Sequence, residues 1–196
     1  EGEEKYALQV YEQMQQEGVL PEKSTYVSVL STCRLHSMST ECKCAHARIM
    51  VRQCGLDLVL GNALLNTYAK CGHLGDAWKM FQDLHVRDVV SWNTLMAGYA
   101  DHGQGDKLLE CYRNMQVEKV APDNTTFTCG LKSCASIGAI KEGQELHKEV
   151  IHRGLDEDLL IGIASEDLYE NFGFEDLFIG TTSVVTFAKH ERYWIR

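Results

Sequence analysis

The chain has 196 residues, of which 44% are apolar and 24% charged, and it contains only two prolines. No apolar run approaches the roughly 18 residues that a membrane-crossing helix needs, which excludes such a helix from this sequence and agrees with an all-helical protein. The formal net charge is −9, with 28 acidic and 19 basic residues, and this argues against a partner rich in phosphate.

Apolar residues recur in groups of four with the spacing i, i+3, i+4, i+7, which is one face of an α-helix. Five such groups, separated by steps of 35, 35, 31 and 35, lie at 7–14, 42–49, 77–84, 108–115 and 143–150. Four more alternate with them at 26–33, 61–68, 92–99 and 127–134. Tandem helical repeats produce this period, so the sequence predicts repeating pairs of helices, A followed by B.

Turn-forming residues fall between the predicted helices. Glycines follow the A helices at Gly72, Gly75, Gly103, Gly105 and Gly138. The two prolines, Pro21 and Pro122, lie in loops after B helices and are 101 residues apart, which is the length of three repeats. The predicted fold is therefore all-α, a right-handed α-solenoid of helix-turn-helix repeats that forms a tetratricopeptide-like superhelix. Trp78 falls outside its apolar group and is expected to be exposed.

Eight cysteines raise the alternatives of disulfides and a metal site. Cys33 and Cys134 occupy equivalent repeat positions, which favours small core residues with reduced thiols. Cys42, Cys44 and His46 form a cluster, but Cys44 points away from the other two on a helix and no second pair stands at zinc spacing, so zinc is the lesser alternative. His46 and His147 hold an aromatic position of their groups, which favours packing over catalysis.

Several runs of residues resemble plant pentatricopeptide repeat proteins: 61–64 (GNAL), 68–72 (YAKCG), 89–95 (VVSWNTL), 134–136 (CAS) and 142–147 (EGQELH). The order of the units resembles the subclass that alternates standard, long and short repeats. By this resemblance, residues 1–22 are a partial repeat with a B helix and its exit loop, 23–57 a long unit, 58–88 a short unit, 89–123 a standard unit and 124–158 a second long unit. Residues 159–196 are a degenerate repeat with a divergent tail.

The resemblance implies that the chain binds single-stranded RNA, with one base read by each unit. In that family the base is read by the fifth and the last residue of a unit, and the apolar second residue wedges against base faces. The pairs carried over are Asn62 with Asp88 and Asn93 with Asp123, and the wedging residues are Val59 and Val90. An amide offers a donor and an acceptor, and the family pattern makes both pairs favour uracil and then cytosine, so adjacent pyrimidines are predicted.

The long units depart from this pattern. Val27 with Asp57 has no polar group at the fifth position, whereas Thr128 with Asp158 is a partial pair that would lean towards guanine. Considered singly, Asn62 and Asn93 also fit surface or capping asparagines at the start of helix A.

The negative charge is concentrated in one stretch. Residues 156–176 hold eight acids and no Lys or Arg, which leaves 20 acids against 19 bases elsewhere, so the repeats proper are nearly neutral. With two well-formed reading pairs and little phosphate neutralisation, weak RNA binding with a shallow salt dependence is expected. Past Ile163 the resemblance decays: Glu166 stands where Leu65 is apolar, and the region is predicted to be either a degenerate cap or sequence unrelated to the fold.

Related proteins often carry a deaminase-like domain for cytidine-to-uridine editing, whose zinc site needs H-x-E followed by P-C-x-x-C. His147-Lys148-Glu149 matches the first half, but no cysteine follows Cys134, so no catalytic residue or cofactor is predicted. The expected function is an RNA-binding module of a mitochondrion or chloroplast that directs editing or processing by factors acting in trans. The alternatives are a helical-repeat scaffold for protein partners and an inactive truncated fragment.

Overall fold

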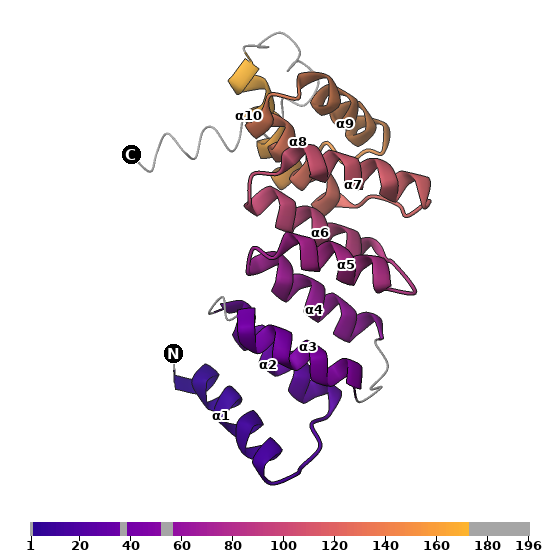
Figure 1. The fold of residues 1–196 in the computed structure, drawn as a ribbon. Helices are drawn as coiled ribbons and strands as arrows, with labels where there is room; N and C mark the ends of the chain where they lie inside the picture. Colours follow the sequence, from indigo (N-terminus) through magenta and orange to yellow (C-terminus); the bar gives the residue numbers. More distant parts are fainter. Residues whose placement is uncertain (1, 36–38, 52–56, 173–196) are drawn as a thin grey trace. The chain divides into compact units, whose positions relative to one another are not determined.

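The structure is a computed structural model that describes residues 2–35, 39–51 and 57–172 (Figure 1). The chain divides into two compact units, of which the first ends at His102 and the second begins at Gly103. Residues 173–196 of the predicted degenerate repeat and tail lie outside the described residues.

The described residues form helices and no strand, which confirms the all-α helical-repeat solenoid. In the first unit these are α1 (Gly2–Gln16), α2 (Lys23–Leu35), α3 (Ser39–Val51), α4 (Leu58–Lys70), α5 (Leu74–Asp83) and α6 (Val89–Asp101). In the second unit they are α7 (Gly105–Val117), α8 (Asn124–Ile137), α9 (Ile140–His152) and α10 (Leu159–Phe172). Among the described helices, none is long and apolar enough to cross a membrane.

In the first unit each A helix packs against its own B helix and against the A helix of the next repeat. Thus α4 contacts α2, α5 and α6, an arrangement visible in Figure 1. The predicted apolar groups form the contacts: Ala77, Met80, Phe81 and Leu84 of the α5 region are buried, as are Leu64, Leu65 and Tyr68 of α4. Phe81 meets Trp92 of α6 edge to face, with ring centroids 4.5 Å apart. One repeat therefore completes the core of its neighbour.

The second unit is built in the same way, with α8 in contact with α7, α9 and α10. Both units also contain the same polar contact in their cores. A hydrogen bond joins His46 Nδ1 to the Tyr68 hydroxyl over 2.9 Å, and another joins His147 Nδ1 to the Tyr169 hydroxyl over 2.6 Å. The two histidines thus link a B helix to the following A helix, in agreement with the packing role predicted for them.

Glycines end several of the helices as predicted. Gly138 follows α8 with φ 76° and ψ 20°, and Gly72 follows α4 with φ 79°, a left-handed conformation that favours glycine. Lys119 adopts φ 59° after α7, which places a non-glycine residue in the same region.

The described cysteines are free thiols, and burial raises the pKa of Cys33 to about 11 and that of Cys134 to about 12. Cys42 is fully buried on α3 whereas Cys44 is exposed, so the two do not face a common point. Within the described residues, no cluster of three His, Cys, Asp or Glu side chains is arranged to hold a metal ion.

One expectation is wrong. Trp78 is half-buried rather than exposed, because its ring stacks on Phe81 at a centroid distance of 5.8 Å. The described part of the predicted degenerate repeat is helical, since α10 continues to Phe172 and packs on α8. Glu166 occupies a buried position, 8% exposed, as its repeat counterpart Leu65 does, and Leu168 and Tyr169 beside it are buried too.

We expect Gly98→Ala to destabilise the chain, because an added Cβ would lie 2.7 Å from the Cβ of Ala69 on the adjacent helix α4. The free-energy cost of overpacking at such a contact exceeds the gain from a higher helix propensity. Urea denaturation should therefore show a net loss of about 1–2 kcal/mol in the free energy of unfolding. The control is Gly75→Ala on α5, where a Cβ meets nothing within 4 Å. It should be neutral or slightly stabilising, and equal effects of both variants would contradict the close approach.

Acid should also destabilise the fold through the two histidines. Burial lowers the pKa of His46 against the opposing effect of Asp83 and Asp76, and it lowers the pKa of His147 against that of Asp156. The unfolded chain therefore binds protons first as the pH falls, so the histidine contribution to stability is complete above about pH 6.5 and declines below it. Urea denaturation between about pH 7 and about pH 5, where ordinary carboxylates stay ionised, should show this slope. A His46→Gln/His147→Gln variant with an unchanged slope would refute the assignment.

Candidate nucleic-acid interface

Each A helix from α4 onwards begins directly after an aspartate that is also the last residue of a predicted unit. Asp57, Asp88 and Asp123 accept hydrogen bonds from the backbone N–H of Leu60, Ser91 and Thr126, over 3.0, 2.8 and 2.9 Å. Asp158 accepts in the same way from Leu160 and Ile161, over 2.9 and 3.2 Å. These aspartates cap the helices, since the first N–H groups of a helix have no partner within it.

Capping by the aspartates corrects the alternative reading of the asparagines. Asn62 and Asn93 lie inside α4 and α6, one turn after the caps, so neither of them caps its helix. Each residue is half-buried on its helix.

Asn62 and Asp88 are brought together by Ser91, a buried residue of α6. The Ser91 hydroxyl lies 2.8 Å from Asn62 Oδ1 and 2.8 Å from Asp88 Oδ1. Burial raises the pKa of Asp88, but hydrogen bonds from the Ser91 backbone, the Ser91 hydroxyl and the Asn62 side chain together outweigh it and leave that pKa below its ordinary value. The Ser91 hydroxyl thus lies between the Asp88 carboxylate and the Asn62 amide and brings both within hydrogen-bond distance of one group.

The other predicted pairs differ from this one. Asn93 belongs to the first compact unit and Asp123 to the second. Asp123 forms a capping box with Thr126 at the start of α8. Thr128 donates its hydroxyl proton to the backbone oxygen of Asn124 over 2.8 Å.

A groove of about 290 Å³ lies over the A helices of the first unit. It is lined by residues of α2, α4 and α6: Val27, Ser31, Arg34, Asn62, Ala63, Asn66, Thr67, Val90 and Thr94. The set contains the fifth residues of two predicted units, Val27 and Asn62, and the second residue of a third, Val90. Val90 and Val59 are 53% and 68% exposed, which leaves their side chains available for contact.

In the long units the terminal aspartate has a further partner. Lys23, the first residue of its unit, donates from Nζ to Asp57 Oδ2 over 2.7 Å. Asn124, first in the second long unit, donates from Nδ2 to Asp158 Oδ2 over 2.7 Å. The hydrogen bond from Lys23 and the one from the Leu60 N–H lower the pKa of Asp57.

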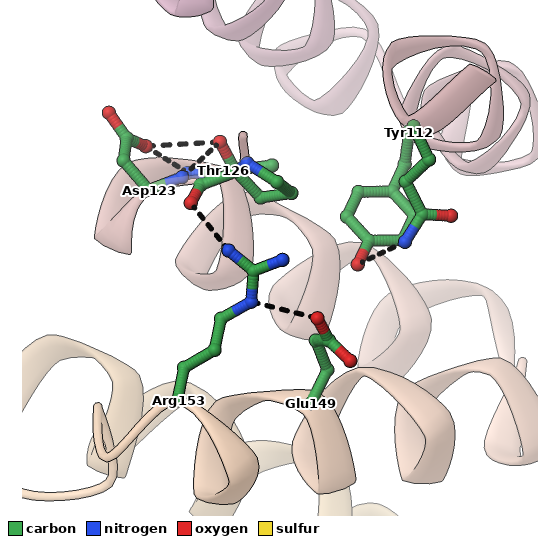
Figure 2. A network of polar contacts seen from close by, with 7 residues as sticks. Tyr112, Asp123, Thr126, Glu149 and Arg153 are labelled. Atoms are coloured by element: carbon green, nitrogen blue, oxygen red, sulfur yellow. Dashed lines mark hydrogen bonds and ion pairs between the residues drawn. The ribbon is translucent and has the colours of Figure 1, made fainter. Parts of the chain in front are cut away.

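The residues that match H-x-E are engaged in structural contacts in the second unit. His147 is bonded to Tyr169. Glu149 accepts from Nε of Arg153 over 2.8 Å, as Figure 2 shows. Arg153 also donates to the backbone oxygen of Pro122 over 3.4 Å and lies over the ring of Phe127. The same arginine thus fastens the end of α9 to the start of α8.

Sequence reasoning did not identify Ser91, Lys23, Asn124 or Arg34. For Ser91 a signal was present, because Asp followed three residues later by Ser or Thr, at 88–91 and at 123–126, is a helix-start pattern. The partners of Lys23 and Asn124 stand 34 residues away, and only the packing of one repeat on the next brings them together.

The helix pairs are stacked, and polar and apolar residues recur on their A helices at the repeat spacing. This arrangement defines a helical-repeat solenoid. Residues 87–136 match the PPR repeat family, and residues 62–89 match the PPR repeat. Residues 62–136 thus match pentatricopeptide repeats, as the sequence motifs predicted.

Relatives in Arabidopsis thaliana are similar over most of this chain. The mitochondrial pentatricopeptide repeat-containing protein At3g02330 is 34% identical over 71% of this chain and 15% of its own length. The protein At4g38010 is 34% identical over 87% of this chain and 30% of its own, and the chloroplastic protein At4g18520 is 29% identical over 76% and 24%. The chain thus spans less than a third of the length of these relatives.

Solved structures share the fold at low sequence identity. The pentatricopeptide repeat protein PPR10 from maize superimposes with a TM-score of 0.67 at 19% identity, over 90% of this chain and 25% of PPR10. PPR10 in complex with an 18-nucleotide psaJ RNA element gives 0.66 at 21%, over 83% of this chain and 24% of that one. The PPR domain of Arabidopsis protein-only RNase P 1 in complex with tRNA gives 0.64 at 16%, over 76% of this chain and 81% of that one.

Replacement of Asp88 should separate its capping role from its charge. Asp88→Ala removes the cap of α6 and should cost about 1 kcal/mol in urea denaturation, whereas Asp88→Ser keeps a capping oxygen and should retain most of that stability. The serine variant therefore serves to test the carboxylate in binding experiments. Equal destabilisation by both replacements would show that the aspartate does more than cap the helix.

Proposed function

We propose that this chain is a sequence-specific single-stranded RNA-binding module in which successive A helices each present reading residues to one base. The observation that carries the proposal is the groove over α2, α4 and α6, because Val27, Asn62 and Val90 from three successive repeats line it together. The complexes of PPR10 with an RNA element and of the RNase P domain with tRNA, which have the same fold, support this proposal.

The proposed reading pairs are Asn62 with Asp88 and Asn93 with Asp123. The contact of Asp88 and Ser91 with Asn62 fixes the amide before a ligand arrives, which lowers the entropy cost of forming a directional hydrogen bond to a base. The amide's adjacent donor and acceptor suit a pyrimidine edge, and exposed Val59 and Val90 offer apolar surface to the base faces. Thr128 with Asp158 is proposed as a weaker pair that favours guanine.

The distribution of charge favours the face formed by the A helices, rather than the face formed by the B helices, as the RNA-binding surface. The groove of the first unit contains Arg34, a cation suited to a backbone phosphate, and no acidic side chain lines it. The groove of about 210 Å³ between the B helices α7 and α9 is lined by Glu142, Glu145 and Glu149 together with Arg113. An excess of carboxylates repels phosphate, so RNA should avoid that surface.

In the full protein this module would direct RNA editing or processing at a site with adjacent pyrimidines. We propose the unit boundaries 23–57, 58–88, 89–123 and 124–158 and the alternating standard, long and short subclass. The mitochondrial and chloroplastic relatives support an organellar location. His147 and Glu149 are committed to Tyr169 and Arg153, and the chemical step is assigned to factors acting in trans.

A scaffold for protein partners is the second candidate, favoured by the acidic groove between α7 and α9, which suits a basic peptide. RNA binding distinguishes the two functions. A chain that is indifferent to every RNA but retains a basic peptide would be a scaffold.

Fluorescence anisotropy with short single-stranded RNAs tests the proposal. The wild-type chain should bind saturably and weakly, with a preference for RNAs that contain adjacent pyrimidines. Asn62→Ala and Asn93→Ala should each weaken that binding by about three- to ten-fold, the size of one or two lost hydrogen bonds, and should reduce the pyrimidine preference.

The matched control is Asn114→Ala, which removes the same side chain from the B helix α7 and should leave the affinity unchanged. Equal losses for Asn114 and Asn62, or retained pyrimidine preference in the Asn62→Ala/Asn93→Ala variant, would reject the assignment of the reading residues.

A further inference from the structure

The two long units contain the same contact at equivalent positions. In each, the first residue of the unit donates a hydrogen bond to the outer oxygen of the last: Lys23 to Asp57 Oδ2 and Asn124 to Asp158 Oδ2, both over 2.7 Å. The other oxygen, Oδ1, is already used to cap the next helix. Both oxygens of these aspartates are therefore engaged within the protein.

The short and standard units cannot form this contact. Their first residues are Leu58 and Val89, whose side chains have no donor. In the short unit the carboxylate of Asp88 is instead linked to the fifth residue, Asn62, through the Ser91 hydroxyl, which lies 2.8 Å from Asp88 Oδ1 and from Asn62 Oδ1. The terminal aspartate thus has a different side-chain neighbour in the long units from the one it has in the short unit.

Resting on the function proposed above, we infer that Lys23 and Asn124 are specificity-determining residues that weaken base reading by the long units. Each occupies Oδ2, the aspartate oxygen that helix capping leaves over, and the unit then discriminates less between bases. We call this contact the aspartate clamp.

The physical reason is competition for one acceptor. In the short unit the aspartate orients the fifth residue, whereas in the long unit a base or a fifth-position amide must first displace a charge-assisted bond from Lys23. Val27, the fifth residue of that unit, has no polar group to compete with the lysine. The side chains of Lys23 and Asp57 are 55% and 42% exposed, so the clamp is a weak, reversible contact rather than a permanent lock.

A polar residue introduced at the fifth position of a long unit should discriminate between bases only when the clamp is removed. Four forms of the full chain are compared: wild type, Val27→Asn, Lys23→Leu and the double variant Lys23→Leu/Val27→Asn. The probes are single-stranded RNAs with an adjacent uridine pair in which the flanking nucleotides are varied one at a time, and anisotropy measures the affinities. Circular dichroism melts confirm that the variants fold.

The double variant should gain a preference for uracil at one flanking nucleotide of about two- to five-fold, the size of an exposed ion pair. Either single variant should show no such preference. Lys79→Leu/Val27→Asn removes an exposed lysine of α5 instead and should behave like Val27→Asn alone, which controls for the loss of charge.

Each result decides between the two proposals. If wild type prefers uridine pairs but Val27→Asn discriminates as well as the double variant, the clamp is refuted while the proposed function stands. If wild type binds no RNA, both are rejected. The second long unit provides an independent repetition with Thr128→Asn and Asn124→Leu, and a gain that requires both changes there supports the clamp.

Discussion

From α4 onwards, hydrogen bonds between an aspartate carboxylate and the first turn of the following A helix connect one repeat to the next. Asp57, Asp88, Asp123 and Asp158 stand between successive repeats and fix the residue at which each A helix begins. Once the start is fixed, the second residue of the helix, such as Val59 or Val90, is exposed, and the fifth is half-buried. The candidate interface is a consequence of this register.

Packing between repeats supplies the stability that one helix pair lacks. Phe81 against Trp92 and His46 against Tyr68 join successive repeats in the first unit, and His147 against Tyr169 does so in the second. The same packing brings the first residue of a long unit to its last, although 34 residues separate Lys23 from Asp57 and Asn124 from Asp158. Stability and the geometry of the candidate interface therefore depend on the same stacking.

The helix pairs could be predicted from the sequence because the i, i+3, i+4, i+7 spacing encodes one buried face, and groups such as 77–84 are buried as expected. The hydrogen-bond partners of individual side chains could not be predicted, because a contact such as that of Ser91 with Asn62 forms only where two helices approach each other. Trp78 was misjudged since its stacking on Phe81 lies outside the group pattern. Glu166 shows that position in the repeat determines burial even where the residue type argues against it.

If the terminal aspartates read bases as proposed, their capping role limits how such a protein can change over evolution. A mutation at Asp88 that altered the preferred nucleotide would also alter how firmly the following helix is anchored, since one of its carboxylate oxygens accepts from the Ser91 N–H. Small side chains with an acceptor, such as Asp, Asn, Ser and Thr, satisfy the start of a helix best. The fifth position does not cap its helix, so under the proposed function new target sequences would be acquired more freely through residues such as Asn62 than through their acidic partners.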